Sequence, residues 1–262
     1  MILRLAVGAL LAALVAGLAE RAGSLSRSGR WAAVCVGALA TAAGWRWSAL
    51  LIAWFVASSL LTRLGRGAKT ARTAGAVEES GARSALQVLA NGSVFALAAV
   101  GYTRTGEASF AAAALGALAA ATADTWATEL GTLWGGAPRS SLSGVPVAKG
   151  MAGGVTIVGL LASLAGAALI ALAGTAFVAP DLMHWDRIAL AGVAGALADS
   201  VLGAAAQHKR RCARCDALTE RRVHDCGTPT VAARGLPWMT NDTVNLLATG
   251  IGALVAVLAS PR

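Results

Sequence analysis

Residues 108–130 read ASFAAAALGALAAATADTWATEL, and this stretch decides the fold. It begins as an unbroken run of small and apolar residues, long enough for a helix to cross a bilayer, which takes about 20 residues. Two carboxylates, Asp124 and Glu129, lie near its end. Ionisable side chains inside a membrane segment are costly and by default mark a functional site. The stretch therefore predicts a membrane helix that carries a site.

The polar side chains of this helix share one side. At 100° per residue they fall within an arc of roughly 160°. The polar set is Thr122, Asp124, Thr125, Thr128, Glu129 and Thr132. The opposite side carries Ala123, Trp126, Ala127 and Leu130. We therefore expect one packing or lipid-facing side and one catalytic or ion-binding side.

The composition places the whole chain in a membrane. Of its 262 residues, 56% are hydrophobic and only 13% are charged, whereas soluble domains have about 25% charged residues. The apolar runs are continuous, which argues against a β-barrel, whose strands alternate apolar and polar residues. The many alanines and glycines let helices approach closely. We predict an all-α, polytopic transmembrane helical bundle, a single integral membrane domain spanning residues 1–262.

The apolar segments number eight, which predicts about seven or eight spans. Their approximate ranges are 4–19, 31–43, 45–62, 85–101, 108–130, 155–179, 187–206 and 242–260. The second is short and closely followed by the third, so these two form a tight hairpin or one is partly re-entrant. The first is interpreted as a helix rather than a signal peptide, because no cleavage site followed by a soluble domain appears.

The positive charges give the orientation. Most of the 22 lysines and arginines lie in four connections, 20–30, 63–84, 131–154 and 207–241. With eight spans these connections share one face, which the positive-inside rule makes cytoplasmic. The net charge of +9 is then explained by this rule and by anionic lipid rather than by nucleic acid. We expect a multi-pass protein of the cell inner membrane with its active site facing the cytoplasm.

Polar residues of several segments gather on that same face, as in a membrane enzyme and unlike the scattered polar groups of a channel or pump. Four acids, Asp124, Glu129, Asp199 and Asp242, could together hold one or two divalent cations such as Mg²⁺, which prefers oxygen ligands. A purely structural role stays open for each of them, and for two of them it is specific. Asp242 could be an N-cap or first-turn acid, and Glu129 could pair with Arg139.

Two further groups suit phosphate oxygens. Lys149 precedes Gly153 and Gly154 at the start of the sixth segment, and backbone amides at a glycine-rich turn before a helix bind anions. The series Arg83, Gln87 and Asn91, and the pair Asn241 and Asn245, place polar groups on one helix side. The alternatives are small-residue packing and interhelical hydrogen bonds.

A compact set of soft ligands lies in the 207–241 connection, expected to be a cytoplasmic loop. Cys212 and Cys215 form a CxxC pair, followed by His224 and Cys226. Three cysteines and one histidine are a standard ligand set for structural zinc. Free thiols or a redox role remain alternatives.

Several ordered motifs resemble one known family. They are Thr62-Arg63 followed by Lys69, Arg83-x-x-x-Gln87-Val-Leu-Ala-Asn91-Gly92, Ala123-Asp-Thr-Trp-Ala-Thr-Glu-Leu-Gly131, Gly153-Gly154-Val-x-x-x-Gly159, Asp199-Ser-x-x-Gly203-Ala204-x-x-Gln207 and Asn241-Asp-Thr-Val-Asn245. The pattern resembles a family of uncharacterised integral membrane proteins that includes plant phytyl-phosphate kinase. It covers about residues 50–260, whereas the first 45 residues resemble the family only in hydrophobicity. The family is distantly similar to CTP-dependent polyprenol and dolichol kinases.

This resemblance implies an isoprenyl-phosphate kinase. Such an enzyme transfers a phosphoryl group from a nucleoside triphosphate, with CTP the family's suggested donor, to a phytyl, geranylgeranyl or polyprenyl monophosphate. Asp124, Asp199 and Asp242 would bind Mg²⁺, with Glu129 as a further ligand or orienting base. The expected substrate-binding set is Arg83, Gln87, Asn91, Thr125, Thr128, Lys149, Gly153, Gly154, Ser200, Asn241 and Asn245. The alternatives are a cation or lipid-phosphate transporter that uses the same buried carboxylates, and a structural membrane protein with a zinc-stapled loop.

Overall fold

The computed structural model describes residues 2–73, 81–179 and 184–260. Most of them are helical. The helices are α1 (Ile2–Arg21), α2 (Arg27–Ala43), α3 (Trp45–Arg63), α4 (Arg66–Thr73), α5 (Ala85–Thr105), α6 (Ala108–Trp134), α7 (Ile157–Phe177), α8 (Trp185–Ala205) and α9 (Asn241–Ala259). The strands are β1 (Arg139–Ser140), β2 (Gly154–Val155), β3 (Lys209–Cys212), β4 (Leu218–Thr219) and β5 (Thr230–Arg234).

The predicted all-α membrane bundle is confirmed. Each of the eight predicted apolar segments corresponds to one long helix. Of the helices in the described ranges, six are long and apolar enough to cross a bilayer, namely α3 and α5 to α9. The second segment is the 17-residue helix α2, and Gly44 alone separates it from α3. Helices α2 and α3 therefore meet in the predicted tight hairpin.

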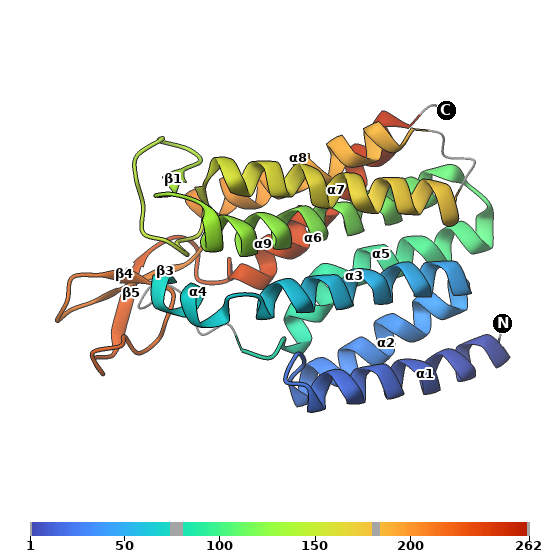
Figure 1. Ribbon diagram of the computed structural model, residues 1–262, viewed down its shortest axis with the longest axis horizontal. Coiled ribbons are helices and arrows are strands. Elements are labelled where there is room, and N and C mark those ends of the chain that lie inside the picture. Colours follow the sequence, from blue (N-terminus) through green and yellow to red (C-terminus); the bar gives the residue numbers. More distant parts are fainter. Residues whose placement is uncertain (1, 74–80, 180–183, 261–262) are drawn as a thin grey trace.

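Helix α6 lies at the centre of the bundle. It packs against α5, α7, α8 and α9, which surround it in Figure 1. Most of its residues from Ala111 to Ala123 are buried. Its small side chains allow this, because helices without large side chains at their contacts approach closely. The stretch that opens the sequence is thus the axis on which the other helices are arranged.

Helix α9 approaches α6 closely. A Cβ atom added to Gly116 would collide with the backbone carbonyl oxygen of Gly252 and would lie 2.5 Å from the Cβ of Ala256. The reciprocal position, Gly252, has the Gly116 oxygen 2.7 Å from where its Cβ would be. Glycine is therefore required on both helices where they meet.

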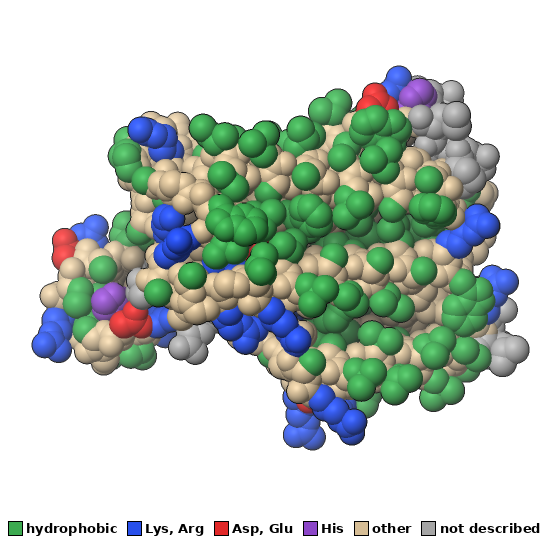
Figure 2. Space-filling view, viewed as in Figure 1, with side chains coloured by type: hydrophobic (Ala, Val, Ile, Leu, Met, Phe, Trp, Pro, Cys, Tyr) green, Lys and Arg blue, Asp and Glu red, His purple; other side chains and the backbone are tan. Residues whose placement is uncertain are grey.

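The two ends of the bundle differ. The chain termini lie at one end, and α4 and all five strands lie at the other (Figure 1). We call the second end the basic end, because it is formed by the four arginine- and lysine-rich connections. Lys and Arg side chains gather mainly there in Figure 2, while hydrophobic side chains cover the flank between the ends. This distribution is that of a protein whose flank contacts lipid.

Four long helices that start at the basic end begin in the same way. The N-cap residues of α2, α5, α7 and α9 are Ser26, Ser84, Thr156 and Thr240, and each side chain accepts a hydrogen bond from the backbone amide three residues later. These caps satisfy amides that have no partner inside the helix. Asp242 therefore lies in the first turn of α9 and is not its N-cap.

Candidate functional site

The acids of α6 and α8 lie at similar depths below the basic end. At 1.5 Å per residue, Asp124 is about 15 Å along the axis from the end of α6, and Glu129 about 8 Å. Asp199 is about 9 Å from the end of α8. Asn91, on α5, is about 9 Å from the start of its helix. The predicted gathering of polar residues toward one end is therefore present in the fold.

Glu129 is held by the junction between α3 and α4. Its carboxylate accepts a hydrogen bond of 2.6 Å from Thr62 Oγ1 and forms an ion pair with Lys69. The Lys69 amine also donates to the carbonyl oxygens of Leu61 and Thr62, at 2.8 and 2.9 Å. Lys69 is 8% exposed. This network ties α4 and the end of α3 to α6.

The alternative that Glu129 pairs with Arg139 is wrong. Arg139 lies on β1, where its guanidinium donates to the carbonyl oxygen of Gly144 at 2.9 Å. Lys69 takes the place that the sequence suggested for Arg139 because the connection after α3 folds back as α4, which contacts α6.

Asp124 and Asp199 form a second acidic group, between α6 and α8. They lie close enough for their charges to interact, and Asp199 also interacts with Glu220. The Asp199 Oδ2 atom is buried and has no hydrogen-bond partner within the described part of the chain. Buried polar atoms are nearly always hydrogen-bonded, so such an exception needs a reason. A cation between the carboxylates is a sufficient one, and oxygen donors are what Mg²⁺ requires.

A cavity of about 280 Å³ reaches α6 at Thr125, the residue after Asp124, although neither Asp124 nor Asp199 lines it. Its walls come from α1, α2, α3 and α5, and are mostly apolar; examples are Ala16, Val36 and Phe55. Four polar residues line its basic end: Arg83, Gln87, Asn91 and Thr125. Since Thr125 follows Asp124 in α6, the cavity reaches the neighbourhood of the carboxylates.

Arg83 is fixed at the end of this cavity. Its backbone amide donates to the Ser24 carbonyl, and its own carbonyl accepts from the Ser26 amide, both at 3.0 Å. Its guanidinium lies over the rings of Phe55 and Trp54, 5.5 and 6.0 Å from the ring centroids. The buried Nη1 has no hydrogen-bond partner in the described ranges. A held guanidinium with a free donor is suited to a phosphate.

The two amides next to Arg83 already have roles in α5. The Gln87 side chain completes a capping box with Ser84, because its Oε1 accepts from the Ser84 amide at 2.9 Å. Asn91 Nδ2 donates to the carbonyl oxygen of Gln87 at 2.9 Å. Both residues line the cavity nonetheless, so each has a further polar atom to offer there.

The glycine-rich segment before α7 packs against other helices. Lys149 Nζ donates to the carbonyl oxygen of Gly135, just beyond α6, and the Gly154 amide donates to Met151. Gly153 has φ +81°, and a Cβ atom there would lie 2.5 Å from the backbone nitrogen of Ala204 on α8. The structure thus gives this segment a packing role, and its phosphate role stays a prediction.

The remaining predicted residues lie around the site. Thr128 is exposed on α6, and the carbonyl of Ser200 on α8 accepts from Ser141 Oγ at 2.9 Å. Asn241, Asp242 and Asn245 occupy the start of α9 at the basic end.

A line of interacting charges crosses the basic end. Each member interacts electrostatically with the next. In order they are Arg83, Glu129, Asp124, Asp199, Glu220 and Lys209. The line joins the cavity on one side to the segment after α8 on the other.

Lys209 and Glu220 are members that the sequence did not single out. The Lys209 amine is buried and donates to the carbonyl oxygen of Ala152 at 2.9 Å. Burial lowers the pKa of Lys209 to about 8, Arg234 lowers it further, and Glu220 acts in the opposite direction. At neutral pH the amine is still mainly protonated. Nothing in the local sequence distinguished Lys209 from the arginines that follow it.

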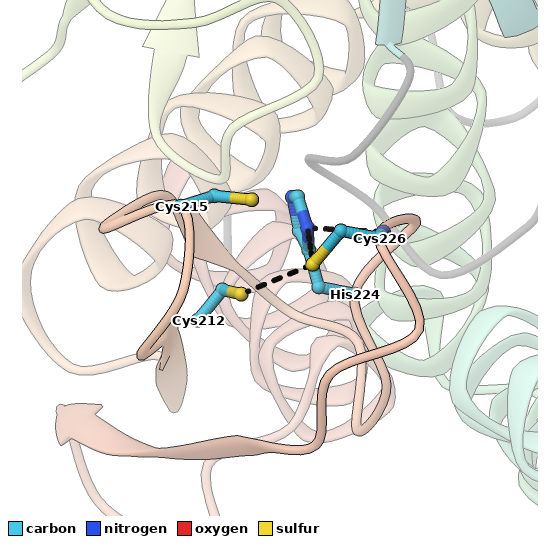
Figure 3. Close-up of side chains that lie close together, drawn as sticks. All are labelled: Cys212, Cys215, His224 and Cys226. Carbon is cyan, nitrogen blue, oxygen red and sulfur yellow. Dashed lines mark hydrogen bonds between the residues drawn. The ribbon is translucent and has the colours of Figure 1, made fainter.

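The four predicted zinc ligands come together beyond α8. One donor atom from each of Cys212, Cys215, His224 and Cys226 can be chosen so that all lie within 4.8 Å of one another. Their side chains point toward a common centre in Figure 3.

Comparison with known proteins places the chain in a family. The model of the integral membrane protein family DUF92 matches residues 10–253. Protein PGR of Arabidopsis thaliana is 31% identical over 98% of this chain and 96% of its own length. An uncharacterized membrane protein of Methanocaldococcus jannaschii is 32% identical over 82% of this chain and 76% of its own.

A further relative is an uncharacterized membrane protein of Synechocystis, 29% identical over 82% of this chain and 74% of its own. No solved structure matches. The family match begins at residue 10, so it also includes α1 and α2, for which the sequence motifs indicated only shared hydrophobicity. The predicted family resemblance is confirmed, and this chain belongs to the integral membrane protein family DUF92.

Proposed function

We propose that this protein is a membrane kinase that phosphorylates an isoprenyl monophosphate to the diphosphate. The donor is a nucleoside triphosphate, CTP by the family resemblance. The observation that carries the proposal is the apolar cavity, which has Arg83, Gln87, Asn91 and Thr125 at its basic end, Thr125 being the residue after Asp124 on α6. An isoprenyl phosphate matches this cavity, because it is an apolar chain with a charged phosphate at one end.

The acceptor binds with its chain in the cavity and its phosphate at Arg83. Moving the chain from lipid into the apolar cavity changes its free energy little, because lipid and cavity wall are similarly apolar. The walls therefore position the chain and add little hydrophobic binding energy. Arg83 supplies charge-assisted hydrogen bonds to phosphate oxygens. The exposed side chains of Leu11 and Ile52 at the cavity wall leave a path for the chain from the bilayer.

Asp124 and Asp199 fit Mg²⁺, with Asp242 at the start of α9 as a further oxygen donor. Bound there, Mg²⁺ would neutralise phosphate charge on the donor nucleotide, which phosphoryl transfer requires. Glu129 is already paired with Lys69, so its contribution is to fix α6 and to balance the charge of Arg83.

In the reaction, an oxygen of the acceptor phosphate attacks the terminal phosphorus of the donor. A new P–O bond forms, and the bond to the nucleoside diphosphate breaks with its electron pair leaving on that product. The acceptor phosphate is mainly dianionic at pH 7, since its second pKa is about 6. No dedicated general base is therefore needed, and the residues act by holding and orienting the two phosphates.

The basic end faces the cytoplasm in this proposal, which places the site on the side where nucleoside triphosphates are found. The support is the concentration of Lys and Arg in the four connections at that end (Figure 2) and the positive-inside rule. For a bacterial chain the membrane is the inner membrane.

The direct test uses purified protein with Mg²⁺ and geranylgeranyl or phytyl monophosphate. Labelled CTP and ATP are supplied in turn, and the lipid product is separated by chromatography. We expect labelled isoprenyl diphosphate with at least one donor and none with an Asp124→Asn variant. No diphosphate with any donor would contradict the proposal, and ion or lipid-phosphate flux in proteoliposomes would favour a transporter instead.

A bulky side chain in the cavity wall is expected to change the preferred chain length. Ala49 lines the cavity from α3, near Trp45 at the end away from Arg83, and is itself exposed, so Ala49→Phe needs no repacking of the core. We expect kcat/KM for a geranylgeranyl acceptor to fall about tenfold relative to a geranyl acceptor.

Ala53→Phe is the matched control, since Ala53 is also exposed on α3 but does not line the cavity. Equal losses for long and short acceptors in Ala49→Phe would show that the chain does not occupy this cavity.

A further inference from the structure

A small lobe follows α8 at the basic end. We call residues 207–240 the Cys/His lobe; it contains the three-stranded antiparallel sheet β4-β3-β5. Its buried side chains are mainly polar: they are Gln207, Lys209, Cys212, Thr219, Thr230 and the single large apolar residue Met239. Its valines Val223 and Val231 are exposed. A segment of this size cannot bury a sufficient apolar core, and domains below on the order of 40 residues usually need a metal or disulfides.

Two tight turns of this lobe face each other. In the first, Cys212 ends β3 and its amide bonds to the Ala217 carbonyl at 2.9 Å, which brings Cys215 round beside it. In the second, the Gly227 amide bonds to the His224 carbonyl at 2.8 Å, with Gly227 at φ +79°. Each turn contributes two of the four ligand side chains, which converge in Figure 3.

The distances suit one metal ion. Cys212 Sγ and Cys226 Sγ are 3.5 Å apart, and His224 Nδ1 is 3.2 Å from Cys226 Sγ. Zn–S bonds of about 2.3 Å place the ligands of a tetrahedral site about 3.8 Å apart. A disulfide needs sulfurs about 2.05 Å apart, and it would leave the third thiol and the histidine without a purpose.

We propose that Cys212, Cys215, His224 and Cys226 bind one structural Zn²⁺ that folds the Cys/His lobe. Three sulfurs and one imidazole favour zinc over Mg²⁺, which takes oxygen ligands. Four protein ligands complete a tetrahedral site and leave no position for a substrate, so the role is structural. The ion stabilises the sheet in which β3 carries Lys209 and β4 is followed directly by Glu220, and the Glu220 charge interacts with both Lys209 and Asp199.

Metal analysis of the full chain tests this directly. The protein is purified in detergent without chelator from cells supplied with zinc. We expect about one zinc ion per chain, loss of that zinc in Cys212→Ser, and its retention in Cys35→Ser, the cysteine of α2 outside the cluster. A wild-type protein without zinc, also after zinc is added, would overturn the proposal, as would unchanged zinc in Cys212→Ser.

A second variant, in which one metal-binding side chain replaces another, tests the site even if Cys212→Ser does not fold. Cys215 is exposed, and Cys215→His retains four metal ligands. We expect this variant to keep its zinc and, with Co²⁺ in place of zinc, to show an altered absorption spectrum with fewer thiolate bands. A Co²⁺ spectrum identical to that of wild type would exclude Cys215 from the site.

Limited proteolysis reports the structural role without any activity measurement. Arg214, Arg221 and Arg222 lie in the turns of the lobe, and trypsin should cut there only after zinc is chelated, leaving the helical bundle intact. Cleavage that is the same before and after chelation would contradict the structural role. An intact Cys212–Cys226 disulfide in freshly purified protein would overturn the site altogether.

Discussion

An Asp199→Asn variant is expected to lose about 10³-fold in kcat/KM while its fold becomes more stable to heat. The loss follows from removing one charged oxygen ligand where phosphate charge must be neutralised, a type of contribution worth 10³-fold or more in phosphoryl transfer. The gain follows because Asp199 Oδ2 is buried without a hydrogen-bond partner within the described residues, beside Asp124 and Glu220. Removing a buried charge that repels its neighbours lowers the energy of the fold.

The two effects are measured separately, by kinase assay and by thermal unfolding in detergent without Mg²⁺ or nucleotide. Asp186→Asn is the matched control, since Asp186 lies on the same helix, α8, at the opposite end and is exposed. It should leave kcat/KM unchanged and, as an exposed first-turn acid, cost no more than about 1 kcal/mol of stability. A lower unfolding temperature for Asp199→Asn would show that the carboxylate is structural. Unchanged activity would remove it from the site.

Lys69→Met is expected to destabilise the protein by about 3–5 kcal/mol, the usual cost of removing one partner of a buried ion pair. The change leaves the Glu129 carboxylate without its cation and frees the carbonyl oxygens of Leu61 and Thr62. Those carbonyls end α3, where a positive charge is also favoured by the helix dipole. Unfolding by heat or denaturant in detergent measures the effect.

Lys149→Met provides the comparison. Lys149 also donates to a carbonyl oxygen, that of Gly135, but its side chain is partly exposed and this hydrogen bond involves no carboxylate. Its loss should cost about 1 kcal/mol. The double variant Lys69→Met, Glu129→Leu should recover much of the stability, because apolar residues can replace a buried pair. A double variant as unstable as Lys69→Met would refute the charge-based explanation.

The helices could be predicted from the sequence because their signal is local. Each long apolar run specifies its own helix, since backbone groups in a bilayer must pair within the segment. Helix α4 was not predicted, because residues 66–73 are polar and contain no apolar run. The contact of Lys69 with Glu129, which ties this helix to α6, is not visible in the local sequence. The sheet of the Cys/His lobe was not predicted either, since its strands are short and polar.

The site was partly predictable. The depth argument placed Asp124, Asp199 and Asn91 at one end, and the structure agrees. The partner of Glu129 was missed because the chain bends at Gly65, between α3 and Lys69. No local sequence pattern gives the direction of that bend. The cavity was missed for a related reason: it exists only where α1, α2, α3 and α5 meet, and each of those helices alone is an ordinary apolar segment.

If the chain is the proposed kinase, the exposed Leu11 and Ile52 at the cavity wall set the variable that governs its rate. Its acceptor would arrive by lateral diffusion within the bilayer, so the relevant concentration would be the mole fraction of isoprenyl phosphate among the membrane lipids. Adding inert lipid at a fixed total amount of acceptor would then slow the reaction, although the bulk concentration is unchanged. The proposed enzyme would thus follow surface-dilution kinetics for its lipid substrate and ordinary solution kinetics for its nucleotide.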